Sequence, residues 1–234
     1  MTLAVSQPTY IPSANYFDLI DCADNFIFLN DVKMEKSSWH HRNRIKKPEG
    51  EHFLTVPVIC PNGILTMINE VELIPKTKWN TKHLKTIQQN YRRSYYYDEV
   101  FPFVFKLYSY ATNNLSDWTI HTIVMICRKI GINTKFYNAS SLQSKGKKDY
   151  RLVEFCKEIG CDTYISAPAG KNYIEIDNPG GQFVLNRIKL KYQEYEYPMY
   201  EQVYGEFMPY LSILDLLFNV GFDRTLEVLR SGRK

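Results

Sequence analysis

Several features that define specialised protein classes are missing from this sequence. None of its five cysteines forms a C-x-x-C pair, and none stands in a Cys/His cluster with the spacing of zinc ligands. Scattered thiols of this kind are typical of cytosolic proteins and indicate reduced cysteines. The N-terminus lacks the basic and apolar regions of a signal peptide, and no window of about 18 residues is apolar enough to span a membrane. We therefore predict a cytoplasmic protein without a membrane span.

A strong charge of either sign is missing as well. Lys and Arg number 29 and Asp and Glu 25, which leaves a formal net charge of +4. A nucleic-acid-binding domain usually has a larger basic excess, so we expect no specific nucleic-acid partner. The sequence has no internal repeat and no G-x-x-x-x-G-K-[ST] loop for nucleotide phosphates. The mild positive charge favours a small anionic ligand.

The sequence does have length, apolar residues and tyrosine. Its 234 residues are 44% apolar, which is enough for one large α/β domain. The 18 tyrosines suit a pocket for a sugar or a nucleotide, because a tyrosine ring has an apolar body and a polar tip. An AT-rich genome would also raise the tyrosine content, so composition alone leaves both explanations open.

The first 46 residues predict a βαβ unit. The apolar run 3–5 and the β-rich run 26–29 flank a helical pattern that includes Tyr16. Such a unit feeds a parallel sheet, and parallel α/β sheets bind ligands at the carboxyl ends of their strands. We expect a ligand-binding cleft there, lined by the polar and aromatic residues that follow the two runs, namely Gln7, Thr9, Tyr10, Asp31, Lys33, Glu35 and Lys36.

Residues 33–47 form a dense charged segment that also contains Trp39 and His40. Arg42 and Arg44 are alternate residues, so an extended segment would point both guanidinium groups to the same side. Two guanidinium groups on one side make a fork for a phosphate or a carboxylate. A basic surface loop anchored by Trp39 explains the same residues, and from the spacing alone it is slightly favoured.

The rest of the chain alternates predicted strands and helices. We expect a β-hairpin from 52–59 and 64–73, with Thr55 facing the cleft. The helix-rich part 79–130 either covers one face of the sheet or forms a small helical insert. Strands are further predicted at 134–139, 163–166 and within 183–196, and helices at 150–159, capped by Asp149, and at 212–218.

Later segments add candidate binding residues. The polar stretch 140–148 could hold an anion through backbone N–H groups, although a flexible exposed loop is the favoured explanation. Ser166 and the small-residue turn 167–170 follow a predicted strand, and small residues let a backbone approach a ligand closely. Asp215 lies in an apolar helix and needs a partner, either backbone or an arginine. The basic tail 230–234 is expected to fray.

A set of spaced motifs extends over essentially the whole chain. It includes Gln7-Pro8-x-Tyr10-x-Pro12, Asn30-Asp31-Val32, Trp39-x-x-Arg42-Asn43-Arg44 and Ser212-Ile213-Leu214-Asp215. With these motifs the sequence resembles the WbqC-like protein family. Two departures are Ser13 and Asn15, where members often have a Trp-x-Gly pair, and Ala167-Pro168, where a Gly-rich turn is expected.

The resemblance implies a bacterial role in the biosynthesis of O-antigen and other surface polysaccharides. The chemistry that it implies is transfer of glycine, another aminoacyl group or an acyl group to a sugar. The predicted fold is a Rossmann-like α/β fold, with a mainly parallel sheet, helices on both faces, a β-hairpin and a helical segment. Its layout is similar to that of nucleotidyltransferases of the HIGH type, although Gln-Pro-Thr-Tyr stands here in place of H-x-G-H.

Candidate roles follow from this chemistry. Asp31 and His40 are the candidate bases for the proton of the acceptor, and Lys36, Arg42 and Arg44 are the candidate anion-holding groups. We assign no metal ligands and no cofactor. The expected partner is a nucleotide-linked sugar, which would react with an acyl or aminoacyl donor of unknown identity. A homodimer is compatible with the sequence. The further candidate substrate-binding residues are Gln7, Tyr10, Tyr16, Trp39, Thr55, Ser166, Gly170, Tyr173 and Asp215.

Two other functions remain open. One is a nucleotidyltransferase that activates a small acid with ATP. The other is a non-catalytic binding partner in glycan assembly, with the tyrosine-rich stretches 91–97 and 192–204 as its interface. The enzymatic hypothesis depends on one geometric expectation, which is that Gln7, Asp31 and the two arginines converge on a single anion-holding cleft.

Overall fold

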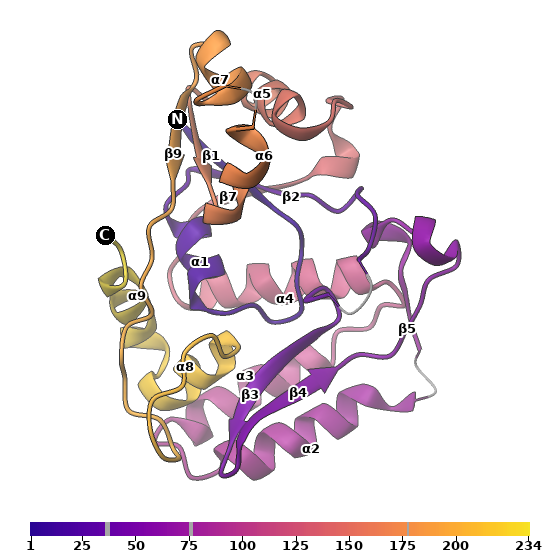
Figure 1. Cartoon of the computed structure of the whole chain (residues 1–234). Coiled ribbons are helices and arrows are strands. Elements are labelled where there is room, and N and C mark those ends of the chain that lie inside the picture. The colour runs from indigo at the N-terminus through magenta and orange to yellow at the C-terminus, as the bar shows by residue number, and fades with distance from the viewer. Residues whose placement is uncertain (36–37, 75–76, 177) are drawn as a thin grey trace.

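The centre of the molecule is a sheet of five parallel strands (Figure 1). The structure, a computed structural model, describes residues 1–35, 38–74, 77–176 and 178–234. In space the strands are ordered β7-β2-β1-β8-β9. When these five strands are numbered by their position in the sequence, the order is 3-2-1-4-5, which is that of Rossmann-type sheets. The predicted α/β class with a parallel sheet is confirmed. The strands are β1 (Thr2–Ser6), β2 (Asn25–Phe28), β7 (Lys135–Asn138), β8 (Thr163–Ser166) and β9 (Lys189–Tyr192).

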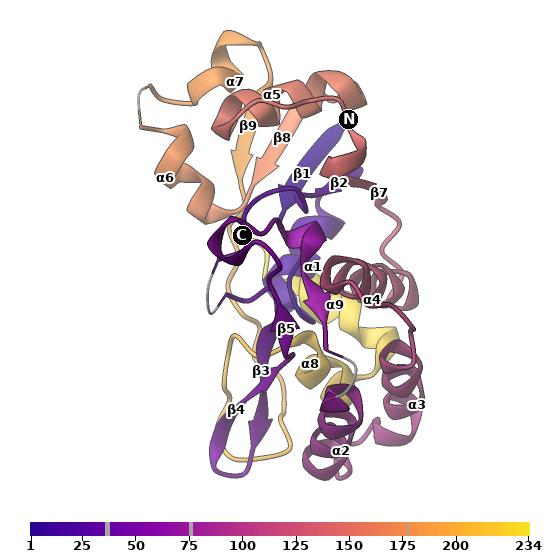
Figure 2. The same ribbon diagram turned by 90° about the vertical axis from the view of Figure 1, so that its right-hand side faces the viewer.

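Helices cover both faces of this sheet because alternate strand residues point to opposite sides. Ala4 and Phe26 belong to a core that α1 (Ala14–Asp21) and α4 (Leu115–Lys129) complete on one face. Leu3 belongs to the core of the other face, which α5 and α7 cover. Figure 2 shows α5, α6 and α7 at one end of the molecule. These helices are α5 (Lys148–Ile159), α6 (Lys171–Ile174) and α7 (Gly181–Leu185).

The predicted helix-rich segment shares the core of the first face. Residues of α2, α3 and α8 join the same buried cluster as Ala4, so these helices form a layer beyond α4. The division of the chain into domains stays a prediction. The helices are α2 (Trp79–Tyr91), α3 (Tyr97–Tyr108), α8 (Ile213–Val220) and α9 (Phe222–Ser231), and the 3-10 turns are η1 (Gly63–Leu65), η2 (Ile68–Glu70), η4 (Ala139–Ser141) and η5 (Pro168–Gly170).

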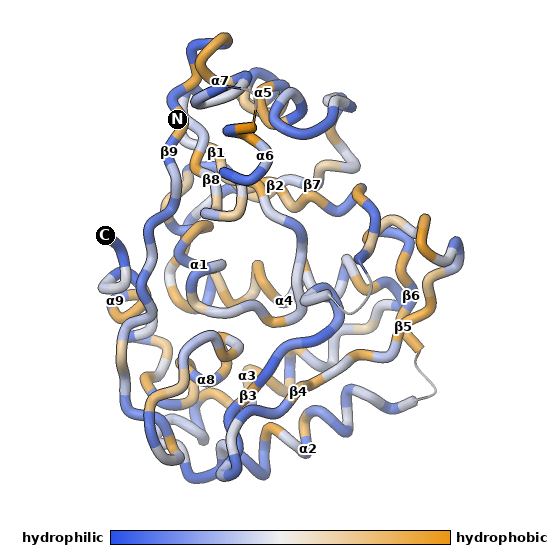
Figure 3. Tube along the Cα trace, in the orientation of Figure 1, coloured by the Kyte–Doolittle hydropathy of each residue, from blue (hydrophilic) through white to orange (hydrophobic). Residues whose placement is uncertain are grey.

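The β-hairpin lies earlier in the chain than predicted. β3 (Arg42–Lys47) pairs antiparallel with β4 (Gly50–Thr55) across a two-residue turn. Pro57 has no N–H for a ladder and follows the end of β4. The expected partner 64–73 supplies only β6 (Glu72–Leu73), which pairs with β5 (Val58–Ile59). Figure 3 shows β3 as a hydrophilic strand, and this polarity hid it from the hydrophobic pattern.

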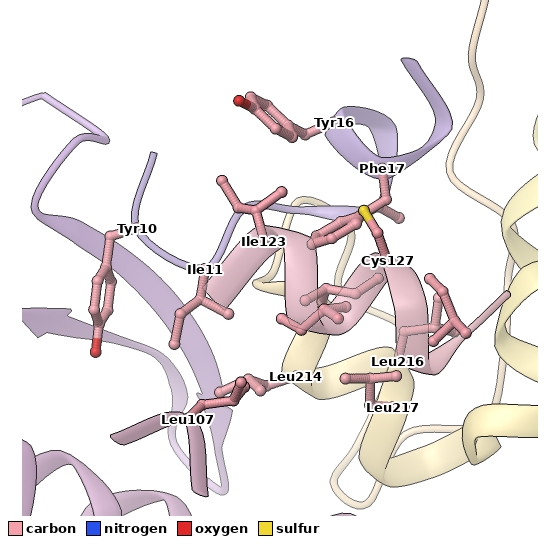
Figure 4. Packing of buried hydrophobic residues seen from close by; sticks show 14 of the residues in the cluster. Tyr10, Ile11, Tyr16, Phe17, Leu107, Ile123, Cys127, Leu214, Leu216 and Leu217 are labelled. Atoms are coloured by element: carbon pink, nitrogen blue, oxygen red, sulfur yellow. The ribbon is translucent and has the colours of Figure 1, made fainter. Parts of the chain in front are cut away.

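Tyr10, predicted to face a ligand, lies in the hydrophobic core instead (Figure 4). Its side chain is fully buried and stacks on Trp118 with ring centroids 5.2 Å apart. Its hydroxyl lies 2.7 Å from Nδ1 of His83 and 2.5 Å from the hydroxyl of Tyr108. Because these partners satisfy the hydroxyl, Tyr10 is a structural residue of the core.

The predicted N-cap of helix α5 and the predicted fraying of the C-terminal tail are both wrong. Lys147, not Asp149, is the N-cap of α5, and Asp149 accepts a hydrogen bond from the backbone N–H of Gln182 at 2.9 Å. The tail does not fray, because the Arg233 guanidinium pairs with Asp18 and Asp21 on α1. The two carboxylates that bind Arg233 are more than 200 residues away in sequence, so no local sequence pattern predicts these ion pairs.

Gly221 links α8 to α9 and should be intolerant of substitution. Its φ of +79° and ψ of 170° belong to a region that only glycine adopts readily. A Cβ there would lie 2.6 Å from the ring of Tyr96. We expect Gly221→Ala to lower the free energy of unfolding by about 1–3 kcal/mol. Urea titration measures this, with Gly205→Ala as the control, since it also has a positive φ of 52° but nothing within 4 Å.

Candidate functional site

A cleft of about 720 Å³ lies at the carboxyl ends of β1, β2 and β8. The strand order reverses between β1 and β8, since β2 and β7 extend the sheet on one side and β8 and β9 on the other. Open parallel sheets bind their ligands at such a crossover point. The volume lies within the range of about 300–1,000 Å³ that small-molecule sites occupy. The lining comes from residues 5–9, 29–33, 145–152 and 164–173, with Met67.

Cationic side chains dominate the charge of this lining. Lys33, Lys145, Lys147, Lys148 and Arg151 line the cleft, and the described part of the lining contains one carboxylate, that of Asp31. Five cations and one carboxylate give this lining a net charge of +4. The whole chain, with 29 basic and 25 acidic residues, has the same net charge, so the residues outside the lining are balanced. The positive field is therefore concentrated at the cleft, where it would attract an anionic ligand.

Asp31 and Arg151 form an ion pair in the wall of the cleft. Nη2 of Arg151 donates to Oδ2 of Asp31 at 2.5 Å, and the two side chains are 11% and 18% exposed. The second carboxylate oxygen, Oδ1, is buried and has no hydrogen-bond partner among the described residues. A buried acceptor without a partner is costly, and an N–H or O–H group of a ligand would satisfy it.

The lysine-containing loop before α5 is held in place by hydrogen bonds to Glu158, near the other end of the same helix. The backbone N–H groups of Gln143 and Ser144 donate to the carboxylate of Glu158 at 2.9 and 3.1 Å. The Ser144 hydroxyl donates to it as well, and these bonds hold the pKa of Glu158 below its ordinary value. Arg151 also donates to the Ser144 carbonyl at 3.2 Å. The loop thus presents its lysines at the N-terminus of α5, where the helix dipole favours an anion.

The segment after β8 forms the opposite wall. Ser166, Gly170 and Tyr173, three of the candidate substrate-binding residues, line the cleft. A Cβ on Gly170 would lie 2.0 Å from Oγ of Ser166, so only glycine leaves that hydroxyl its present position. Burial raises the pKa of Tyr173 above its ordinary value, so its hydroxyl, protonated at neutral pH like that of any tyrosine, stays a hydrogen-bond donor at higher pH as well.

The structure divides the candidate residues into two groups. Five of them line the cleft together, namely Gln7, Asp31, Ser166, Gly170 and Tyr173. Tyr16 lies behind this group and donates its hydroxyl to the Gln7 carbonyl at 2.9 Å. Whether these residues bind a substrate stays a prediction.

The candidate base His40 lies outside the lining. Its side chain is 3% exposed, and Nδ1 donates to the carbonyl of Pro8 at 3.0 Å. Burial lowers its pKa, so it is neutral near pH 7. His40 therefore fastens the segment before β3 to the segment after β1. Lys36 lies outside the described residues.

The two arginines of the hairpin do not reach the cleft, so the expected convergence is wrong for them. Each guanidinium group lies over an aromatic ring, either that of Trp39 just before β3 or that of Phe53 on β4. The Arg44 guanidinium lies 5.6 Å from the ring centre of Trp39, and that of Arg42 lies 5.1 Å from Phe53. Arg44 also pairs with Glu51 at 2.6 Å. Thr55 pairs with Arg42 in the β3–β4 ladder and is likewise outside the lining.

Asp215 belongs to a buried polar network on α8. Its side chain is fully buried and accepts hydrogen bonds from the hydroxyls of Tyr91 at 2.8 Å and Tyr200 at 2.9 Å. Burial raises its pKa although these bonds oppose the change. The predicted partner, backbone or an arginine, is wrong, because two tyrosine hydroxyls take that place.

Sequence reasoning missed Arg151 and gave too little weight to the lysines of 145–148. The sequence contained one usable signal. The polar, glycine-containing loop directly precedes a helix, and such a loop can hold an anion. Nothing local indicated that Arg151 would face Asp31, since 120 residues separate them.

Two further observations concern metal ligands and membrane-spanning helices. Within these ranges, no group of three or more His, Cys, Asp or Glu residues is arranged to hold a metal ion. No helix in the described part of the chain combines the length and the apolar character needed to cross a membrane.

The fold and the cleft together define an α/β protein with a basic site at the crossover of a Rossmann-type sheet. A family model narrows this class. The model of the WbqC-like protein family matches residues 7–227, so the chain belongs to this family and the resemblance seen in the motifs is confirmed. The uncharacterized protein Rv1507c of Mycobacterium tuberculosis is 32% identical over 223 residues, which cover 94% of each chain. No solved structure matches the chain.

Proposed function

We propose that this protein acts in surface-polysaccharide biosynthesis and transfers an aminoacyl or acyl group to a nucleotide-linked sugar in the cleft. The observation that supports ligand binding is the excess of cationic side chains at the β1–β8 crossover. A nucleotide diphosphate carries at least two negative charges, and lysine and arginine are its usual protein partners. The polysaccharide pathway and the acyl chemistry rest on the family resemblance. The proposed location is the cytoplasm, with which five free thiols agree.

The roles follow from the positions of the charges. The lysines of 145–148 hold the diphosphate, with the N-terminus of α5 behind them. Oδ1 of Asp31 accepts the proton of the sugar amine or hydroxyl as that group attacks the carbonyl carbon of an activated ester. The new C–N or C–O bond forms, the bond to the leaving group breaks, and Asp31 passes the proton to the leaving group. Arg151 orients Asp31 through the bond to Oδ2.

A thermal-shift screen with UDP-, GDP-, CMP- and dTDP-linked sugars tests the ligand class. At about 100 times its dissociation constant, a ligand stabilises the folded state by about 2.7 kcal/mol, which raises the Tm by about 5–10 °C. We expect such a shift with at least one nucleotide-linked sugar. The double variant Lys147→Ala/Lys148→Ala should lose it without a loss of stability, because both side chains are exposed.

Lys157→Ala is the matched control, because Lys157 lies on the same helix and its side chain is 53% exposed and paired with Glu154. Its ligand-induced shift should equal that of the unmodified protein. Equal shifts in the double variant and in the control would refute the assignment of the cleft. Asp31→Asn should retain ligand binding and lose transfer of the acyl group.

One alternative function keeps specific support. The strand order and the crossover cleft also suit a HIGH-type nucleotidyltransferase that activates a small acid with ATP. This function predicts pyrophosphate release that depends on ATP and on the acid. A non-catalytic binding partner predicts no stabilisation by any small molecule, so the screen and the pyrophosphate assay together separate the three functions.

A further inference from the structure

An exposed strip of aromatic rings runs across the molecule outside the cleft. Trp39 stacks on Phe53 with ring centres 6.0 Å apart, and Tyr210 contacts Tyr197 at 4.4 Å. Arg44 joins the two pairs, since it lies over the Trp39 ring and its Nε donates to the Tyr210 carbonyl at 3.1 Å. We call Phe53, Trp39, Tyr210 and Tyr197 the aromatic strip. Figure 2 shows the segment after β9 running beside the β3–β4 hairpin, which brings the two pairs together.

The strip is costly for the folded protein. Trp39, Phe53 and Tyr210 are 47%, 38% and 55% exposed. Tyr210 also has a φ of +63°, in the left-handed region that bulky residues rarely adopt. The exposed part of an aromatic ring and a strained backbone do not stabilise the fold, and such features concentrate at binding sites.

One end of the strip widens into a groove of about 480 Å³, lined by Tyr195, Tyr197, Phe207, Pro209 and Tyr210. The other end lies beside the cleft. The carbonyl of Trp39 accepts a hydrogen bond from the backbone N–H of Tyr10 at 2.9 Å. The preceding residue, Thr9, lines the cleft. An extended ligand in the groove could therefore follow the strip toward the cleft.

The charges along the strip decide which ligand fits. Arg44 is paired with Glu51 at 2.6 Å, and Lys234 at the groove is paired with Glu196 at 2.5 Å. The Arg42 guanidinium lies over the Phe53 ring, and its buried Nε has no hydrogen-bond partner among the described residues. A nucleic acid would need several unpaired cations for its phosphates, and one arginine does not supply them. Rings with polar tips, beside charges that are mostly paired, suit a neutral ligand that has apolar ring faces and many hydroxyl groups.

We infer that the aromatic strip and its groove bind an oligosaccharide chain, the glycan in whose assembly the cleft ligand takes part. The apolar faces of successive sugar rings pack on Trp39, Tyr210 and Tyr197. The Tyr210 hydroxyl and the paired carboxylates at the rim exchange hydrogen bonds with sugar hydroxyls, whereas Tyr197 offers its ring face, because its hydroxyl already donates to Oδ1 of Asn15 at 2.7 Å. This site is separate from the nucleotide-binding cleft, and its ligand does not depend on the reaction there.

Trp39 supplies a direct readout. Of the three tryptophans, Trp79 and Trp118 are 7% and 1% exposed, so acrylamide quenches mainly the fluorescence of Trp39. We expect maltohexaose, chitohexaose or laminarihexaose to protect this fluorescence in a saturable manner. Trp39→Phe should remove the quenchable component. Absence of protection by all three saccharides, or protection only by a decathymidylate or a decaproline peptide, would overturn the inference.

Variants of Tyr210 separate binding from folding. Tyr210→Phe keeps the ring and should bind the saccharide within about threefold of the unmodified protein. Tyr210→Gly removes the ring and relieves the positive φ, so it should melt no lower than the unmodified protein and bind at least tenfold more weakly. Tyr95→Ala is the matched control, because Tyr95 is 88% exposed and outside the strip. Unchanged binding in Tyr210→Gly would refute the site.

The two proposals fail independently. The double variant Lys147→Ala/Lys148→Ala should keep saccharide binding and lose the nucleotide-linked sugar, and Tyr210→Gly should do the reverse. If the nucleotide screen fails while acrylamide quenching responds to a saccharide, the strip remains a glycan-binding site and only the proposed function falls. If quenching fails while the screen succeeds, only the strip is refuted.

Discussion

Arg233→Ala is expected to lower the free energy of unfolding by about 3 kcal/mol, because it removes the partner of a buried charge. The Asp18 carboxylate is fully buried, and Nε of Arg233 donates to it at 2.5 Å. Arg233 also pairs with Asp21, which joins the C-terminal residues to α1. Without the guanidinium, the Asp18 carboxylate keeps, among the described residues, the neutral amide of Gln193 at 2.7 Å and the weakly donating thiol of Cys22 at 3.9 Å. An uncompensated buried carboxylate is among the most destabilising single changes.

Urea and thermal denaturation measure this loss, which corresponds to a fall in Tm of about 10 °C for a chain of this length. Arg224→Ala is the matched control on α9, since the Arg224–Glu227 pair is 3.9 Å long and its side chains are 66% and 76% exposed. The control should change the free energy of unfolding by less than about 1 kcal/mol. Equal effects of the two changes would show that the Arg233 pair does not anchor the tail.

Acidification from pH 6.5 to pH 4 is expected to remove about 3 kcal/mol of stability through His83 alone. Burial lowers the pKa of His83 to about 4, and a hydrogen bond with the Thr55 backbone opposes this shift only in part. An exposed histidine in the unfolded chain has a pKa of about 6.5. The unfolded state therefore binds the proton first. The contribution of His83 is fully present above pH 6.5, declines as the pH falls, and levels off below pH 4.

Chemical denaturation at a series of pH values, for the unmodified protein and for His83→Gln, isolates this contribution. The variant is less stable at pH 7, because the Tyr10 hydroxyl loses its 2.7 Å partner, but its stability should depend less on pH. His52→Gln is the comparison variant: burial lowers the pKa of His52 as well, but His52 is less deeply buried, so this change should flatten the pH profile less than His83→Gln does. His40, whose pKa burial also lowers, adds loss of the same sign in every variant. Parallel pH profiles for His83→Gln and the unmodified protein would contradict the assignment.

The opening βαβ unit could be predicted from the sequence because its signals are local. The apolar runs of β1 and β2 and the spacing of Tyr16, Leu19 and Ile20 each lie within a few residues. The parallel sheet and the position of Asp31 after the second strand followed from that unit. Tyr10 shows the limit of such reasoning, because an aromatic residue beside a predicted site can equally complete a distant core.

The sequence by itself determined most of the helices and the strands of the parallel sheet, the family, and the edge of the sheet at which a ligand should be expected, because periodicity, turn residues and motifs act over short distances. Only the tertiary structure decided which charges meet at that edge. Asp31 and Arg151 face each other because the parallel crossovers bring the ends of β1, β2 and β8 to one side of the sheet. The arginines of β3 are held elsewhere, because their hairpin packs on the C-terminal segment. Contacts between residues that are more than a hundred positions apart cannot be predicted from a local sequence pattern.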